Sequence, residues 1–159
     1  MSPRGLSRFL SLVTGRRSVL LGIVCLGLAP WTSLAAAERT PEFIVIVHPD
    51  NPQNAATREF LADAFLKKTT RWSHDETIRP VDLRPSSATR RYFSDRVLKR
   101  SVAAVRSYWQ QRIFSGRGVP PPELDDERSA VHYVLKYPGA VAYVAGDTKL
   151  EGAKVLAIH

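Results

Sequence analysis

The chain has 159 residues, a length typical of one domain, and its 23 basic and 15 acidic residues give a formal net charge of +8. Four arginines and no acidic residue lie in residues 1–37, so the remaining 122 residues carry 19 basic and 15 acidic side chains, and this mild excess without a dense basic cluster argues against a nucleic-acid partner. The one cysteine, Cys25, lies in the same N-terminal segment, so residues 38–159 have no disulfide framework and no thiolate chemistry.

Residues 1–37 have the pattern of a secretory signal peptide. A basic start precedes a mostly apolar run at 18–29, which is short for a bilayer span, and Ala35–Ala37 offers a cleavage site. We therefore expect a signal peptide at 1–37, with a retained membrane anchor as the alternative, and a periplasmic domain at 38–159 without a membrane span. Arg16-Arg17 is similar to a twin-arginine export motif, and the general secretory route fits equally well.

The first elements of the mature part are a strand and a helix. The run FIVIV at 43–47 is continuously apolar and lies between prolines, which predicts a strand buried on both faces. Apolar residues then recur at helical spacing over 57–67, with Asn54 or Thr57 as the capping residue. A second strand is predicted at 77–83, in which Pro80 indicates a sheet edge or a bulge.

Three more helices are predicted before the chain returns to strands. Each has candidate capping residues, namely Ser86 or Ser87, Ser101, and Asp125 or Asp126. The middle helix has four apolar residues at the spacing of a buried stripe: Val102, Val105, Trp109 and Ile113. Strands are then predicted at 140–144 and 154–158. The order β-α-β-α-α-α-β-β indicates an α/β domain with helices packed over a small sheet.

A series of short motifs along this domain resembles a known family. The motifs are, in order, FIVIVHPDNP, AFLKK, RW, VDL, SSATRRYF, SYWQQRIFSGRG and YPGAVAYV. The series is similar to the phosphate-type solute-binding proteins of ABC importers and covers most of residues 43–145. The resemblance implies a single lobe of the two-lobed periplasmic-binding-protein (PBP)-like fold, with a small mixed sheet covered by about four helices.

The resemblance also implies a ligand-binding turn at the start of the second helix. In the family, a serine and a threonine at a helix N-terminus hold phosphate, and an arginine precedes them. Ser87-Ala88-Thr89 matches the turn and Arg84 the arginine. The candidate ligand-binding residues are therefore Arg84, Ser86, Ser87, Thr89 and Arg90. Free N–H groups, the helix dipole and guanidinium groups suit such a site. The alternatives are a plain helix cap for the hydroxyls and a solvated face for the arginines.

The sequence carries no catalytic motif of the hydrolase or nucleotide-binding type, so we expect no enzyme and no cofactor. His48 and Asp50 follow a strand and could form a metal or acid–base pair, but a turn with an Asx hydrogen bond is the preferred interpretation. His74-Asp75-Glu76 lacks the spacing of a metal site, and we expect no metal. Two functions remain. The first is weak binding of phosphate or a similar oxyanion. The second is a periplasmic interaction module, without a small ligand, for a transporter or another envelope protein.

Overall fold

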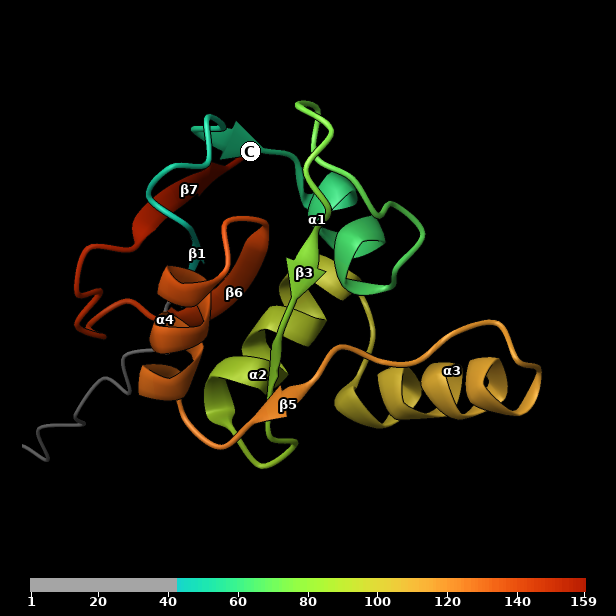
Figure 1. The fold of residues 1–159 in the computed structure, drawn as a ribbon. Coiled ribbons are helices and arrows are strands. Elements are labelled where there is room, and N and C mark those ends of the chain that lie inside the picture. Colours follow the sequence, from blue (N-terminus) through green and yellow to red (C-terminus); the bar gives the residue numbers. More distant parts are fainter. Residues whose placement is uncertain (1–42) are drawn as a thin grey trace, which may run out of the picture. The chain divides into compact units, whose positions relative to one another are not determined.

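We describe residues 43–159 in a computed structural model (Figure 1). The predicted signal peptide at 1–37 lies outside the described residues and stays a prediction. The strands are β1 (Phe43–Val47), β2 (Ala55–Ala56), β3 (Arg79–Pro80), β4 (Asp82–Leu83), β5 (Glu123–Leu124), β6 (Ala140–Ala145) and β7 (Lys154–Ile158). The helices are α1 (Arg58–Phe65), α2 (Ala88–Phe93), a π-helical turn η1 (Ser94–Leu98), α3 (Val102–Phe114) and α4 (Glu127–Lys136).

The sheet is small and mixed, as predicted. Its strand order is β2-β7-β1-β6-β3, and β4 and β5 form a separate parallel pair. β1 is antiparallel to β6 and β7, whereas β2 is parallel to β7 and β3 is parallel to β6. The sequence does not predict β2 and β5, because two-residue strands carry no periodicity. The α/β class with four α-helices is confirmed.

The core lies around the central strands β1 and β6. Val45, Ile46 and Val47 of β1 are fully buried, and the first five residues of β6 are buried as well. Since successive side chains of a strand point to opposite faces, this burial requires cover on both faces of the sheet. Helices α4 and α2 both pack on β1 and β6. Residues 45–47 are therefore buried on both faces of the sheet, as the continuous apolar sequence predicts, whereas Phe43 and Ile44 are half-buried.

Local capping fixes the start of each α-helix. In every case a capping side chain accepts a hydrogen bond from the backbone N–H three residues later, which stabilises a helix end by about 1 kcal/mol. The capping residues are Thr57 for α1, Ser87 for α2, Ser101 for α3 and Asp126 for α4. The structure thus selects Thr57, Ser87 and Asp126 where the sequence left two choices.

The predicted buried stripe of α3 is only half correct. Val105 and Trp109 are buried, but Val102 is half-buried and Ile113 is 49% exposed. Figure 1 shows the C-terminal half of α3 lying away from both sheets. The spacing identified the correct face of the helix, but the rest of the fold covers only the N-terminal part of that face.

The predicted strand at 77–83 divides at Val81. β3 forms the edge of the five-stranded sheet, where Pro80 needs no hydrogen-bond donor, so the expected edge position is confirmed. The chain then leaves that sheet, and β4 pairs with β5. Asp82 donates its N–H to the Pro122 carbonyl at 2.9 Å. This change of sheet brings Asp82 beside the start of α2.

Candidate functional site

The start of α2 presents an open helix end to solvent. The Ser87 hydroxyl accepts the N–H of Arg90 at 3.2 Å, and the Ser87 N–H donates to the Arg84 carbonyl at 3.0 Å. The N–H groups of Ala88 and Thr89 have no acceptor within residues 43–159. Arg84 and Ser86 are exposed. Besides Arg84, the exposed Arg91 lies here, since its guanidinium donates to the Ser86 carbonyl at 3.0 Å. This end therefore retains two backbone donors, two hydroxyl protons and two nearby cations.

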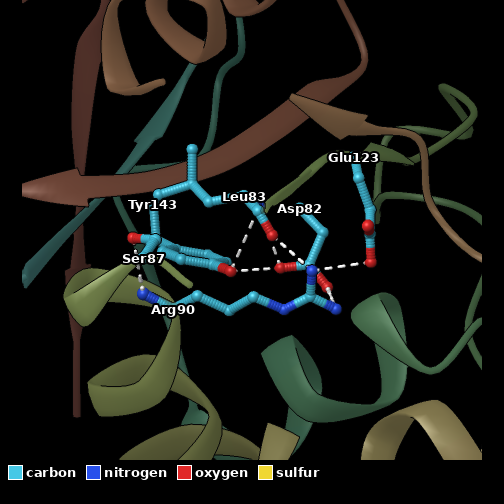
Figure 2. Close-up of polar contacts among 6 residues, drawn as sticks. All are labelled: Asp82, Leu83, Ser87, Arg90, Glu123 and Tyr143. Carbon is cyan, nitrogen blue, oxygen red and sulfur yellow. Dashed lines mark hydrogen bonds and ion pairs between the residues drawn. The ribbon is translucent and has the colours of Figure 1, made fainter. Parts of the chain in front are cut away.

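Arg90 lies in the interior, so the expectation of a solvated face is wrong for this residue. Its side chain is 4% exposed, and its guanidinium contacts three groups (Figure 2). It pairs with Asp82 at 3.0 Å and with Glu123 at 2.7 Å, and it donates to the Leu83 carbonyl. Its Nε is buried and has no partner in the described part of the chain. The charge of Arg90 is thus balanced by two carboxylates of the protein.

Asp82 and Tyr143 complete this buried network. The Tyr143 hydroxyl donates to Asp82 Oδ1, and the Leu83 N–H donates to the same oxygen at 3.0 Å. Burial raises the pKa of Asp82, while the neighbouring Arg90 and the Tyr143 hydroxyl oppose that rise. Burial, and then the Asp82 charge, raise the pKa of Tyr143 far above its usual range. Tyr143 therefore stays a protonated donor and ties β6 to β4 and α2.

Thr89 is also engaged by the protein. It is buried, and its hydroxyl donates to Glu127 at the start of α4. The second oxygen of Glu127 accepts the Thr148 hydroxyl at 2.7 Å. Because a hydroxyl has one proton to donate, Thr89 has no side-chain donor left for an anion. Its contribution to an oxyanion would come from its backbone N–H.

The five predicted residues thus divide into two groups. Arg84, Ser86 and Ser87 lie at the surface near the helix end, whereas Thr89 and Arg90 face the interior. The surface group is not surrounded by cations alone. Asp126 accepts a hydrogen bond from the Ser129 N–H, and this bond lowers the pKa of Asp126. The charge of Arg84 lowers the same pKa by a smaller amount. An acidic side chain therefore lies within electrostatic range of Arg84.

Sequence reasoning missed the carboxylates that hold Thr89 and Arg90, namely Asp82, Glu123 and Glu127. Asp82 gave one usable signal, since an acid between two apolar strand residues, Val81 and Leu83, indicates a buried and paired carboxylate. Glu123 and Glu127 follow a proline run and a turn. Nothing in their local sequence indicates that they face α2.

A pocket of about 520 Å³ lies beside the network. Asp82, Arg90 and Glu123 line its polar end, and Arg106 adds a second cation. Apolar residues form much of the remaining wall: Pro85, Val102, Ala103, Trp109, Ile113, Pro120 and Pro121. With two acids and two cations, this wall is balanced in charge, so it offers a phosphate no net attraction.

The described residues hold neither a cluster of metal ligands nor a membrane-spanning helix. Residues 43–159 contain no group of three or more His, Cys, Asp or Glu side chains placed to hold a metal ion. None of the helices in this range is long and apolar enough to cross a membrane.

Comparison with known proteins places the fold. A family profile described as "PBP superfamily domain" matches residues 40–157. The chain belongs to this superfamily. Searched against curated proteins, the sequence has no match.

Several solved structures of other proteins share the fold of this chain. A putative phosphate ABC transporter substrate-binding protein from Clostridium perfringens, with bound phosphate, matches with a TM-score of 0.60 at 18% identity over 74% of this chain and 45% of that one. A phosphate transport receptor from Vibrio cholerae matches at 0.57, with 18% identity over 74% and 46% of the two chains. PstS from Borrelia burgdorferi matches at 0.58, with 13% identity over 75% and 47%. The chain spans less than half the length of these proteins.

Proposed function

We propose that this PBP-superfamily protein is an exported binding protein, not an enzyme, that holds phosphate or a similar oxyanion weakly at the start of α2. The observation that carries the proposal is the open end of α2, with the free N–H groups of Ala88 and Thr89 beside the exposed Ser86 and Arg84. Helix N-termini with free N–H groups attract anions. A phosphate-bound protein among the structural neighbours supports the same ligand class.

The geometry limits the affinity. A charge at an exposed helix N-terminus gains about 0.3–1 kcal/mol, whereas micromolar binding needs about 8 kcal/mol and millimolar binding about 4 kcal/mol. The charge of Arg90 is already balanced by Asp82 and Glu123. The exposed Arg84 and Arg91 therefore supply the main side-chain attraction, and we expect a dissociation constant of about 1 mM or weaker.

A second candidate function is an interaction module without a small ligand. It is favoured by the contacts of Thr89 and Arg90, whose side-chain donors are held by Glu127, Asp82 and Glu123 rather than left for a ligand. In this case the lobe would serve as a periplasmic partner of a transporter or another envelope protein. Neither candidate requires a cofactor or a metal.

An NMR titration of the ¹⁵N-labelled protein with phosphate, and with sulfate at matched ionic strength, tests the first candidate. We expect phosphate to shift the amide signals of Ala88 and Thr89, and Arg84→Gln with Ser86→Ala to weaken the effect. Arg58→Gln is the matched control, because Arg58 is an exposed arginine at the start of α1. Absence of shifts with either anion would refute oxyanion binding and leave the interaction module, which periplasmic cross-linking then tests.

Export is tested separately. If residues 1–37 are a signal peptide, the mature protein recovered from the periplasm will begin near Glu38, as mass spectrometry of its N-terminal peptide will show. A protein that keeps its first 37 residues and sediments with membranes would instead support the retained anchor.

A further inference from the structure

The C-terminal end of α3 and the loop after it expose apolar side chains to solvent. We call residues 112–119 (RIFSGRGV) the α3 tip. Within it, Ile113 is 49% exposed, Val119 63% and Phe114 90%. In the described part of the chain, one other large hydrophobic residue, Val155 of β7, is similarly exposed. Scattered exposed apolar residues are ordinary, but three within seven residues, one of them a nearly bare phenylalanine, indicate a contact surface.

The same region is strongly basic. Between residues 96 and 122 the sequence has no acid and six cations: Arg96, Lys99, Arg100, Arg106, Arg112 and Arg117. All except the half-buried Arg112 are exposed. The rest of residues 38–159 has 13 basic and 15 acidic side chains, so the positive charge of the domain is concentrated around α3. A segment with this excess of positive charge attracts a partner of the opposite sign.

Hydrogen bonds within the α3 tip fix its shape, rather than packing against other elements. The Ser115 N–H donates to the Gln111 carbonyl at 3.1 Å, and the Arg117 N–H donates to the Arg112 carbonyl at 2.9 Å. Arg112 also donates from its guanidinium to the Arg117 carbonyl at 2.9 Å. Gly116 has a φ of +68°, which suits the turn, and no atom lies within 4 Å of the position where its side chain would be. The tip therefore displays Phe114 in a defined turn that nothing else in residues 43–159 covers.

We propose that the α3 tip docks on an anionic phospholipid surface. Phe114, Ile113 and Val119 would enter the boundary between headgroups and acyl chains, while Arg112 and Arg117 stay at the level of the phosphates. Basic residues beside exposed aromatic and aliphatic side chains are the arrangement that binds such surfaces. The long arginine side chains suit this depth difference, because their charged ends can remain hydrated.

The spacing of the charges favours a lipid surface over a protein partner. The fully buried core of a protein–protein interface is more apolar than the rest of the surface and is enclosed by a polar rim. In the α3 tip, each apolar residue lies within two positions of an arginine, so apolar and charged residues alternate closely along the chain. A fluid surface of uniform negative charge accepts such an interleaved pattern. This proposal uses residues outside the proposed oxyanion site, so each can fail without the other.

Co-sedimentation with lipid vesicles tests the proposal. The full chain is incubated with vesicles of phosphatidylcholine alone and of phosphatidylcholine with about 30% phosphatidylglycerol, at low and physiological salt. The variants are Phe114→Ser with Val119→Ser, and Arg106→Glu with Arg112→Glu and Arg117→Glu. Val155→Ser and Arg58→Glu are matched controls, since they remove an exposed apolar residue and reverse an exposed cation elsewhere. Far-ultraviolet circular dichroism verifies that every variant is folded.

We expect binding to the anionic vesicles that weakens with salt, falls about tenfold or more in both tip variants, and is unchanged in both controls. The apolar run at 18–29 can itself bind lipid, but that binding would not respond to the tip variants. Absence of binding to anionic vesicles, or equal binding by wild type and tip variants, would overturn the proposal. Binding to polyglutamate but not to vesicles, abolished by the arginine changes, would also overturn it and assign the surface to an acidic protein.

Discussion

The buried ion pair between Arg90 and Asp82 gives the sharpest prediction about stability. Replacing Arg90 with Met keeps most of the apolar length of the side chain but removes the guanidinium. Asp82, whose side chain is 9% exposed, would then keep only the Tyr143 hydroxyl and the Leu83 N–H as partners. The variant thus leaves a carboxylate in the interior without its counter-charge.

The expected loss follows from the burial of the two partners. Removing one member of a buried ion pair costs about 3–5 kcal/mol, because the other charge is left uncompensated. The pair of Arg90 with Glu123 adds less than about 1 kcal/mol, since the Glu123 side chain is 48% exposed and solvent screens it. We expect a total loss near 4 kcal/mol at neutral pH, a large part of the 5–15 kcal/mol typical of a domain.

The loss should depend on pH in a definite direction. Burial already raises the pKa of Asp82, and Arg90 is the largest influence opposing that rise, so its removal raises this pKa further. A carboxyl group whose pKa is raised by folding contributes stability at low pH and loses that contribution as the pH rises through its folded-state pKa. The free energy difference between wild type and Arg90→Met should therefore be larger at about pH 7.5 than at about pH 4.5.

Urea denaturation followed by tryptophan fluorescence measures these free energies. The double variant Asp82→Asn with Arg90→Met removes both charges and should recover at least half of the loss at neutral pH. A single variant that loses less than about 1 kcal/mol, or a loss that is the same at both pH values, would show that Asp82 is not an uncompensated charge in the variant. Our account of the network would then be wrong.

Three further changes test other contacts, each by the same denaturation. Tyr143→Phe removes the hydroxyl that donates to Asp82 and should cost about 1.5–3 kcal/mol, and an unchanged midpoint would contradict this hydrogen bond. Ser87→Ala removes the cap of α2 and should cost about 1 kcal/mol, whereas Ser86→Ala, which removes no cap, should change stability by less than 0.5 kcal/mol; equal effects would count against the cap. Gly139→Ala would place a methyl group against the Thr77 backbone carbonyl and should cost about 2 kcal/mol or more, and a loss below about 0.5 kcal/mol would contradict this close approach.

Several features of the fold could be predicted from the sequence because they depend on few residues close together. The capping residues Thr57 and Ser87 act on N–H groups three positions away, so the local sequence contains both partners. Five consecutive apolar side chains indicate the strand at 43–47, because such a run needs cover on both faces of a sheet wherever the strand lies. The order of motifs also indicated the PBP-like fold, which the family match bears out.

The sequence was less informative about the burial of side chains, because burial depends on how far the neighbouring elements extend. The stripe on α3 has regular spacing from Val102 to Ile113, yet burial stops at Trp109. Periodicity specifies a direction around the helix axis, but it contains nothing about where the neighbouring elements end. Exposure of Ile113 and Phe114, on which the lipid proposal rests, is therefore a property of the tertiary structure.

The sequence by itself determined the class of fold and the start of α3, and it narrowed each of the other helix starts to two residues. Through the family resemblance it also gave the position of the candidate anion site at the start of α2. The tertiary structure alone decided which side chains of that candidate site are free of contacts with the rest of the protein. Arg90 meets Asp82, eight residues earlier, because the chain changes sheets at Val81, and it meets Glu123, 33 residues later, because β5 pairs with β4. Local sequence cannot encode such contacts. A charged residue indicates the sign of the partner that would stabilise it, but not which distant segment folding will place beside it.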